Sequence, residues 1–461
     1  MSEPKAGVPA ASIPRSTLHG VLSLLAVVMA LSIATPLAAQ KPAPVAQIIP
    51  HPALAPIPTG AQFDAAGHFD PESATQAYLD TFSPEKRAAS DKYFEGGYWL
   101  TLWDAVVSIV ILLFVLYSGV SAKLRDFAMA RSGNLSLQSA IYFVPFFLLI
   151  SLIGAPWTWY ESFYRERLYQ QSHQSMAVWL HDQFVGLAIS VVLGAIVIAI
   201  LYAIARRLPR TWHLWGAAVV WLFGALAAMA FPVYIAPLFN TYSRIQDPAV
   251  TSPILQMAHA NGISVNDLYQ VDASRQTTKV SANVSGLFAT TRITLNDNLL
   301  RTSSLPEIEA VTGHEMGHYV LHHVFHGLVE QGVVIFLMFV ALRRWLESMQ
   351  RRHGVRWGTT SIYDPALLPG VFLIFTVIGL LLTPVSNTLT RTQEHEADMF
   401  GLNASRQPDG FAQAMLKLGQ YRKLSPGPVE EVIFYDHPSG HTRILDAMRW
   451  KSQNQGTEGY K

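Results

Sequence analysis

Two histidines four residues apart form the most chemically specific pattern in this sequence, His314-Glu315-Met316-Gly317-His318. In a helix, residues four apart lie on one face, so both imidazoles can reach the same metal ion. Glu315 adjoins the first histidine and can take a proton from a water at that metal. The pattern predicts metal-assisted peptide hydrolysis with Glu315 as general base. A helix whose histidines merely face water is the alternative, so a third ligand is needed.

Candidates for that third ligand lie in the sequence RTQEHEAD at 391–398. A catalytic zinc has three protein ligands and one open position, and two histidines with a glutamate are a common set. Glu394 and Asp398 lie four apart, so the first could bind metal while the second accepts the N–H of a ligand histidine. By chemistry alone, His395 and Glu396 compete with Glu394, and a solvated acidic face is a further alternative.

The remaining histidines have weaker patterns. His322, His323 and His326 follow the two candidate ligands closely. We interpret them as lining or surface groups, because a fourth protein ligand would close the metal site. His437 precedes a proline in a C-terminal loop. It could donate a hydrogen bond to a developing oxyanion, although a lone loop histidine usually lies at the surface.

Composition limits the classes of protein that could hold these residues. Of 461 residues, only 14% are charged, against about 25% in typical soluble domains. The net charge of +1 argues against a nucleic-acid partner. There is no cysteine, which excludes disulfides, thiolate metal sites and a cysteine nucleophile. These features favour a membrane protein.

Apolar runs of the length of a membrane-spanning helix, about 20 residues, recur along the chain. Six of them lie near 98–120, 139–160, 178–204, 213–238, 328–346 and 366–388. A seventh, near 19–39, follows a leader with Lys5 and Arg15 and ends in small residues. It fits a signal peptide or a first transmembrane helix equally well. The sequence therefore predicts a mainly α, polytopic membrane protein with six or seven spans.

The basic loops predict an orientation. Arginine and lysine gather near 121–138, 205–212 and 343–365, and the positive-inside rule makes these loops cytoplasmic. Residues 240–327 and 389–461 then face the opposite side. We predict an integral protein of a bacterial inner membrane whose active site faces the periplasm.

These runs divide the chain into six parts. The two metallopeptidase parts are expected to pack together as one small α+β cap. The parts are 1–39, a signal peptide or first span; 40–97, a proline-rich extracytoplasmic linker with short surface helices; 98–240, a four-helix membrane region; 241–327, the metallopeptidase part with HExxH; 328–388, two transmembrane helices; and 389–461, the metallopeptidase part with the third ligand.

Taken together, the motifs resemble the type I CAAX prenyl endopeptidases, integral-membrane zinc metalloproteases. The similarity extends from about residue 225 to 445, and weakly back to about 85. It is carried by FPVYIAPLFNTYSRIQDP at 231–248, VDAS at 271–274, TRITLNDNLL at 291–300, EIEAVTGHEMGH at 307–318, RTQEHEAD at 391–398, and His437-Pro438 with Arg443.

The resemblance implies one Zn²⁺ per chain, with the third ligand on Glu394 and the supporting acid on Asp398. It implies that His437 and Arg443 contact the substrate or the oxyanion. The family's seven helices enclose a large chamber that contains the metal site. Its reaction removes the last three residues after a prenylated cysteine.

We expect a peptide or protein substrate, lipid-modified or not, to bind as an added strand beside 281–287, where Ala282 and Asn283 would contact it. Prenylated proteins are made in the cytoplasm, whereas the predicted orientation places the site outside. One alternative is therefore an envelope quality-control protease. The other is a transporter or lipid-binding chamber with a vestigial metal site, which the scarcity of charges within the spans argues against. The sequence leaves the oligomeric state open.

Overall fold

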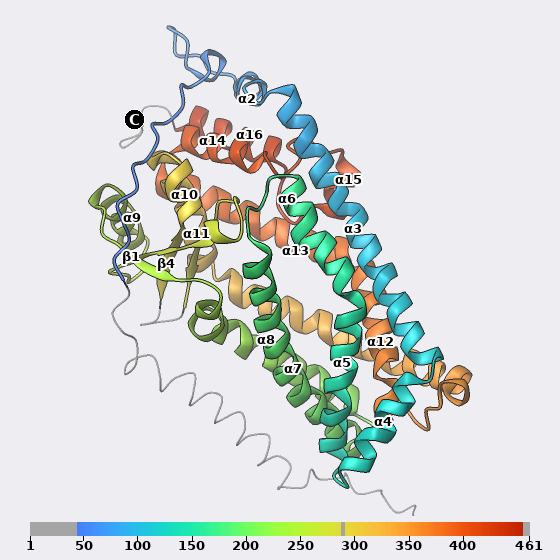
Figure 1. Cartoon of the computed structure of the whole chain (residues 1–461). Helices are drawn as coiled ribbons and strands as arrows, with labels where there is room; N and C mark the ends of the chain where they lie inside the picture. The colour runs from blue at the N-terminus through green and yellow to red at the C-terminus, as the bar shows by residue number, and fades with distance from the viewer. Residues whose placement is uncertain (1–43, 287–290, 455–461) are drawn as a thin grey trace, which may run out of the picture.

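The computed structural model describes residues 44–286 and 291–454. Within these ranges, six helices are long and apolar enough to cross a bilayer, which confirms the six predicted spans. They form an elongated bundle (Figure 1). Their bounds are α3 (Pro84–Tyr117), α5 (Leu135–Trp159), α7 (Met176–Arg207), α8 (Trp212–Ala230), α12 (His323–Trp357) and α13 (Leu368–Ser405). The predicted run at 19–39 lies outside the described residues.

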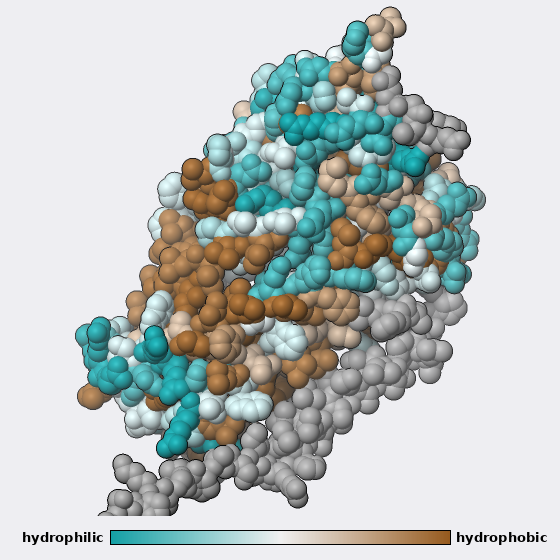
Figure 2. Space-filling view, turned by 180° about the vertical axis from the view of Figure 1, so that it is seen from behind, coloured by the Kyte–Doolittle hydropathy of each residue, from teal (hydrophilic) through white to brown (hydrophobic). Residues whose placement is uncertain are grey.

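At one end of the bundle, a cap of short helices and one sheet confirms the predicted small α+β part (Figure 1). Hydrophobic side chains gather over the middle of the molecule, and hydrophilic ones gather toward both ends (Figure 2). A short helix, α4 (Val120–Arg131), lies at the end remote from the cap. The cap helices are α2 (Pro71–Asp80), α9 (Pro248–Ala260), α10 (Asp297–Thr302), α11 (Leu305–Val320), α14 (Pro408–Leu418), α15 (Pro428–Phe434) and α16 (Gly440–Gln453).

The sheet has the order β1-β2-β4-β3 and is mixed: β2 and β4 are parallel, and the outer strands pair antiparallel to them. Residues 44–46, within the predicted linker, pair with the β1 edge. The Ala46 N–H donates to the Arg244 carbonyl over 2.8 Å, and the Arg244 N–H donates to the Pro44 carbonyl over 2.7 Å. Among the described residues, β3 is therefore the edge left unpaired. The strands are β1 (Tyr242–Ile245), β2 (Leu268–Val271), β3 (Ala282–Ser285) and β4 (Arg292–Asn296).

Two of the spanning helices extend well beyond their apolar runs. α13 continues without a break from Leu368 to Ser405, past the predicted domain boundary at 388. Intrahelical hydrogen bonds are as available outside the bilayer as within it, and no helix-breaking residue follows Pro384 in this helix. The candidate third ligands therefore lie on the same rigid helix as a membrane span. α11 and α12 are separated only by Leu321 and His322, and His322 has a left-handed φ of 58°.

The helix α2 is one of the short helices predicted for this segment, with one face exposed and the other packed against the core of the cap. Tyr78 and Leu79 are 1% and 2% exposed and pack with apolar side chains of α14 and α16. Their apolar surface is hidden because α2 packs along α16. Within the bundle, a cavity of about 1340 Å³ lies between α3, α5, α7 and α13. None of the candidate metal ligands is among the residues that line this cavity.

Candidate metal centre

The helix that carries the HExxH pattern begins at a reciprocal cap. Ser304 donates both its backbone N–H and its hydroxyl to the Glu307 carboxylate, each over 2.7 Å. Lys417 of α14 binds the same carboxylate at 2.7 Å. A capping box of this kind satisfies orphan donors at the helix start. It fixes where α11 begins, and therefore which face carries His314 and His318.

Glycines allow α11 and α13 to approach each other closely. A Cβ atom on Gly401 would lie 2.7 Å from the backbone nitrogen of His314, and one on Gly317 would lie 3.0 Å from the Cα of Ala397. Carbon atoms in ordinary contact are about 3.5–4.0 Å apart, so only glycine fits both positions. This contact brings the third-ligand segment of α13 beside the two histidines. The sequence analysis did not predict this helix contact, although one of its two glycines, Gly317, lies within the HExxH pattern.

The structure brings the three predicted ligands together. Ligand atoms of His314, His318 and Glu394 all lie within 4.8 Å of one another. The His314 Nε2 atom is 3.2 Å from Glu394 Oε2, and the His318 Nε2 atom is 3.4 Å from Glu394 Oε1. The alternatives lie elsewhere: His395 is half exposed and pairs with Asp446 at 3.3 Å, while Glu396 contacts a different histidine.

The donor set fits a metal ion. The two Nε2 atoms face each other at 3.1 Å. When the opposite ring nitrogens carry the protons, both facing atoms present lone pairs, which repel unless a cation lies between them. Glu394 Oε2 is buried and faces the Nε2 atoms of both His314 and His437 at 3.2 Å. Two neutral imidazoles and a carboxylate are ligands that zinc takes in catalytic sites.

Asp398 and Arg443 support the first ligand from behind. The His314 Nδ1–H faces Asp398 Oδ1 at 2.8 Å, and the Arg443 Nε–H donates to Asp398 Oδ2 over 2.8 Å. This contact fixes the histidine tautomer that leaves Nε2 free for metal. Burial lowers the pKa of His314, but hydrogen bonds to Asp398 and Glu394 outweigh it and raise the pKa to about 9.

The predicted substrate contact of Arg443 is therefore corrected. The side chain is 4% exposed, and its guanidinium is paired with the buried Asp398 carboxylate. A buried carboxylate needs a cationic partner, and Arg443 supplies it. Position in the sequence could not reveal this pairing, since the two residues lie on different helices.

His323 supports the second ligand in the same way, a role that sequence reasoning missed. Its Nδ1 atom is 3.0 Å from His318 Nδ1, and its Nε2 atom is 3.1 Å from Glu396 Oε2. A His318 Nδ1–H donating to His323, and a His323 Nε2–H donating to Glu396, satisfy both contacts with neutral rings. Of the two roles predicted for His323, the surface role is wrong, since its ring is buried. The feature of the sequence that could have indicated this role is the position of His323, directly after the turn that ends α11.

Glu315 and His437 flank the metal group. Burial raises the pKa of Glu315 above its usual value, against the opposing effect of the two neighbouring histidines. A raised pKa suits a base that must later return its proton. His437 Nε2 lies 3.2 Å from Glu394 Oε2. Burial lowers the pKa of His437 below its usual value, against the opposing hydrogen bond to Asp436.

The loop that carries His437 is held by α13. Arg391, one turn before Glu394, donates to the carbonyl of Tyr435 over 2.7 Å. The Asp436 carboxylate contacts His437 Nδ1 at 2.7 Å. The loop histidine is therefore placed relative to the third ligand by the same helix.

The predicted substrate strand lies beside the metal helix. Ala282 and Asn283 are the first two residues of β3, which packs against α11. Ala282 joins the core under the sheet, whereas Asn283 is exposed. The free edge of β3 thus runs along the helix that carries Glu315.

Comparison with known proteins agrees with this geometry. Residues 70–241 match the family model described as CAAX prenyl protease N-terminal, five membrane helices, and residues 244–451 match peptidase family M48. An uncharacterized metalloprotease of Bacillus subtilis is 27% identical over 81% of this chain and 88% of its own length. CAAX prenyl protease 1 of Saccharomyces cerevisiae is 26% identical over 66% of this chain and 71% of its own length.

The fold is also known from a solved structure. The crystal structure of S. mikatae Ste24p superposes with a TM-score of 0.67 at 19% identity, covering 81% of this chain and 93% of that one. Fold, site and relatives define an integral-membrane metalloendopeptidase. The chain belongs to the M48 peptidases of the CAAX prenyl protease type.

Proposed function

We propose that this protein is a zinc-dependent endopeptidase in which His314, His318 and Glu394 hold the metal. The observation that carries the proposal is the convergence of these three side chains within 4.8 Å. Zinc bound there would lower the pKa of a water molecule and polarise the scissile carbonyl. Glu315 accepts a proton from the attacking water and passes it to the leaving amine. His437 donates a hydrogen bond to the developing oxyanion.

The substrate binds as a strand along β3, with Ala282 and Asn283 in contact with it. Three features support this role: β3 is a sheet edge, it packs against α11, and residues 44–46 already cover the other edge. Pairing through the backbone positions a peptide with little dependence on its side chains. The scissile bond is thereby brought toward Glu315.

For the substrate class, we propose C-terminal processing of a lipid-modified peptide, as the names of the yeast and plant relatives suggest. Envelope quality control is the second candidate, and orientation favours it. The basic loop near 121–138 belongs to α4, at the end of the bundle opposite the cap (Figure 1). By the positive-inside rule, the metal centre would then face the periplasm of a bacterial inner membrane.

Cleavage by purified protein tests both proposals, with wild type compared with Glu315→Gln and zinc measured in each. The substrates are a farnesylated CAAX peptide, its unprenylated twin and an unfolded protein. We expect about one zinc per chain in both proteins and cleavage by wild type alone. Preference for the farnesylated peptide would support processing, and indifference to the prenyl group would support quality control. Equal behaviour of the two proteins would refute the catalytic role and favour a non-catalytic chamber.

A further inference from the structure

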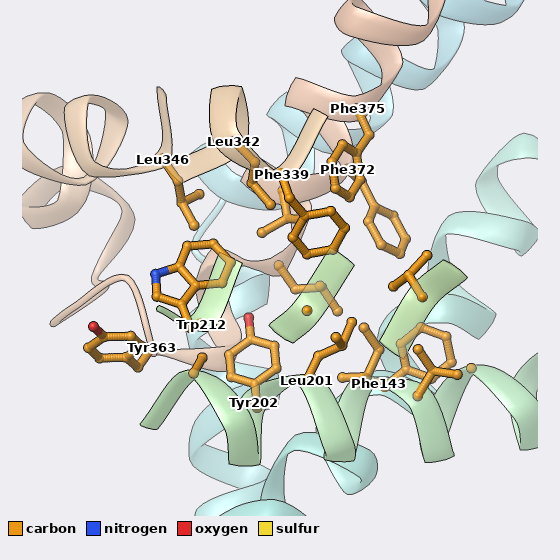
Figure 3. Close-up of a pocket in the computed structure, with 18 of the residues that line it drawn as sticks. Phe143, Leu201, Tyr202, Trp212, Phe339, Leu342, Leu346, Tyr363, Phe372 and Phe375 are labelled. Carbon is orange, nitrogen blue, oxygen red and sulfur yellow. The ribbon is translucent and has the colours of Figure 1, made fainter. Parts of the chain in front are cut away.

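A second cavity, of about 340 Å³, lies between α7 and α8 on one side and α12 and α13 on the other (Figure 3). Aromatic and aliphatic side chains form nearly all of its wall. Those that define its shape are Phe143, Leu201, Trp212, Phe339, Leu346 and Phe375. An apolar cavity of about 150 Å³ accommodates a benzene-sized molecule, so this one has room for a longer hydrocarbon.

The cavity is separate from the metal centre. Phe375, on its wall, precedes the metal ligand Glu394 by 19 positions on α13. At 1.5 Å per residue, this separates the two by about 28 Å along the helix. Tyr363 and Trp212 line the end of the cavity that is nearest the basic segments. A lipid attached to a peptide in the active site would have to extend over that distance to reach it.

Basic side chains surround the cavity at that end. The Arg206 guanidinium lies 5.5 Å from the ring centre of Tyr202, which lines the wall. Arg343, in α12 next to the lining residue Leu342, donates to the carbonyl of Arg210 over 2.7 Å. The run 205–213 contains three arginines and no acidic residue, and 341–357 contains five arginines and one glutamate. Glu347 pairs with Arg343 at 3.4 Å, but the arginines of the two runs outnumber their acidic residues by eight to one, so this end of the cavity favours an anion.

One polar group of the wall lacks a partner. The indole N–H of Trp212 is buried, with no acceptor among the described residues. A buried donor without an acceptor is destabilising, by roughly 1–3 kcal/mol. An ester carbonyl next to a hydrocarbon chain would satisfy it without adding charge to the cavity.

We propose that this cavity binds one acyl chain of an anionic glycerophospholipid from the adjacent leaflet. The chain fills the apolar cavity, an ester carbonyl accepts from Trp212, and the phosphate lies against Arg206 and Arg343. Anionic lipids are attracted to basic segments at the membrane surface, by about 1 kcal/mol for each arginine or lysine. The bound lipid packs the four helices at the end remote from catalysis.

Native mass spectrometry of the full-length, delipidated protein tests the proposal. The probes are dioleoyl phosphatidylglycerol and dioleoyl phosphatidylcholine, added separately. We expect one tightly retained phosphatidylglycerol per chain and at least tenfold weaker retention of phosphatidylcholine. Val220→Trp, which fills the cavity, should abolish retention, and the double variant Arg206→Gln/Arg343→Gln should weaken it about tenfold or more.

Matched controls distinguish this site from the general lipid shell. Val192→Trp alters a side chain of α7 that is 58% exposed and does not line the cavity, and Arg352→Gln removes an exposed charge. Both should retain the lipid as wild type does. Equal retention of the two lipids, or undiminished retention by a Val220→Trp protein that still cleaves peptide, would overturn the proposal. A farnesylated peptide that displaces the phosphatidylglycerol would also overturn it and assign the cavity to substrate.

Discussion

The close contact between α11 and α13 makes Gly401→Ala the most informative substitution in this protein. The added Cβ would lie 2.7 Å from the backbone nitrogen of His314 and 2.9 Å from its Cα. Both are backbone atoms of a helix and cannot turn away. Restoring a contact of about 3.5 Å requires the helices to separate by roughly 0.8 Å. Glu394 lies on the same helix, so that separation moves the third ligand away from the two histidines.

The expected loss follows from this displacement. A misplacement of about 1 Å at a catalytic site can cost about 100-fold in rate, or about 2.7 kcal/mol of transition-state stabilisation. We therefore expect kcat/KM to fall about 100-fold and bound zinc to decrease, as measured by peptide cleavage and elemental analysis. Gly317→Ala should have a smaller effect in the same direction, because its Cβ would lie 3.0 Å from Ala397 Cα.

Gly379→Ala is the control on the same helix. A Cβ there would meet no atom within 4 Å. Replacing a helical glycine by alanine favours the helix by about 1 kcal/mol at either position, so only the space available differs. The reasoning would be refuted if Gly401→Ala kept its zinc and its kcat/KM within twofold of Gly379→Ala.

Three further predictions concern the same centre. Asp398→Asn should lower zinc affinity about 10- to 100-fold while Asp446→Asn does not, measured by chelator competition, and equal affinities would contradict the tautomer argument. The pKa of His314 is raised to about 9, so protonation of this ring stabilises the metal-free protein fully below pH 6.5, and the stabilisation is lost as pH rises through about 9. The Tm of the metal-free protein should therefore fall over that pH window. Zinc binding at pH 7.5 should release a proton, which calorimetry in two buffers detects. Arg391→Gln should lower kcat several-fold at unchanged zinc content, because only the loop carrying His437 loses its support; a change in zinc content alone would contradict this.

Much of the architecture follows from sequence-local properties. A run of about 20 apolar residues is stable in a bilayer only as a helix, so each of the six spans could be located from composition. The ends of the helices could not be located in this way. α13 continues to Ser405 because nothing after Pro384 interrupts its hydrogen bonding, and hydrophobicity carries no information about helix length outside the membrane.

The covering of the sheet edges also depended on tertiary contacts. A proline-rich stretch without periodicity indicates an extended chain, and residues 44–46 are indeed extended. These residues pair with β1, which lies some 200 positions away along the chain. No local sequence pattern encodes a pairing between segments so far apart. That pairing is what leaves β3 as the free edge beside α11.

The sequence by itself determined the kind of chemistry, because a pair of histidines four apart on a helix and the adjacent glutamate are fixed by helical geometry alone. The tertiary structure decided which acid completes the metal group, because Glu394, Glu396 and Asp398 lie on one helix and differ only in the direction they face. The glycine contact between α11 and α13 sets that direction: it turns Glu394 toward His314 Nε2, Asp398 toward His314 Nδ1 and Glu396 toward His323. Where a side chain's role depends on the packing of two helices, that role is decided by how closely the helices approach each other. The spacing of the residues along the chain does not determine it.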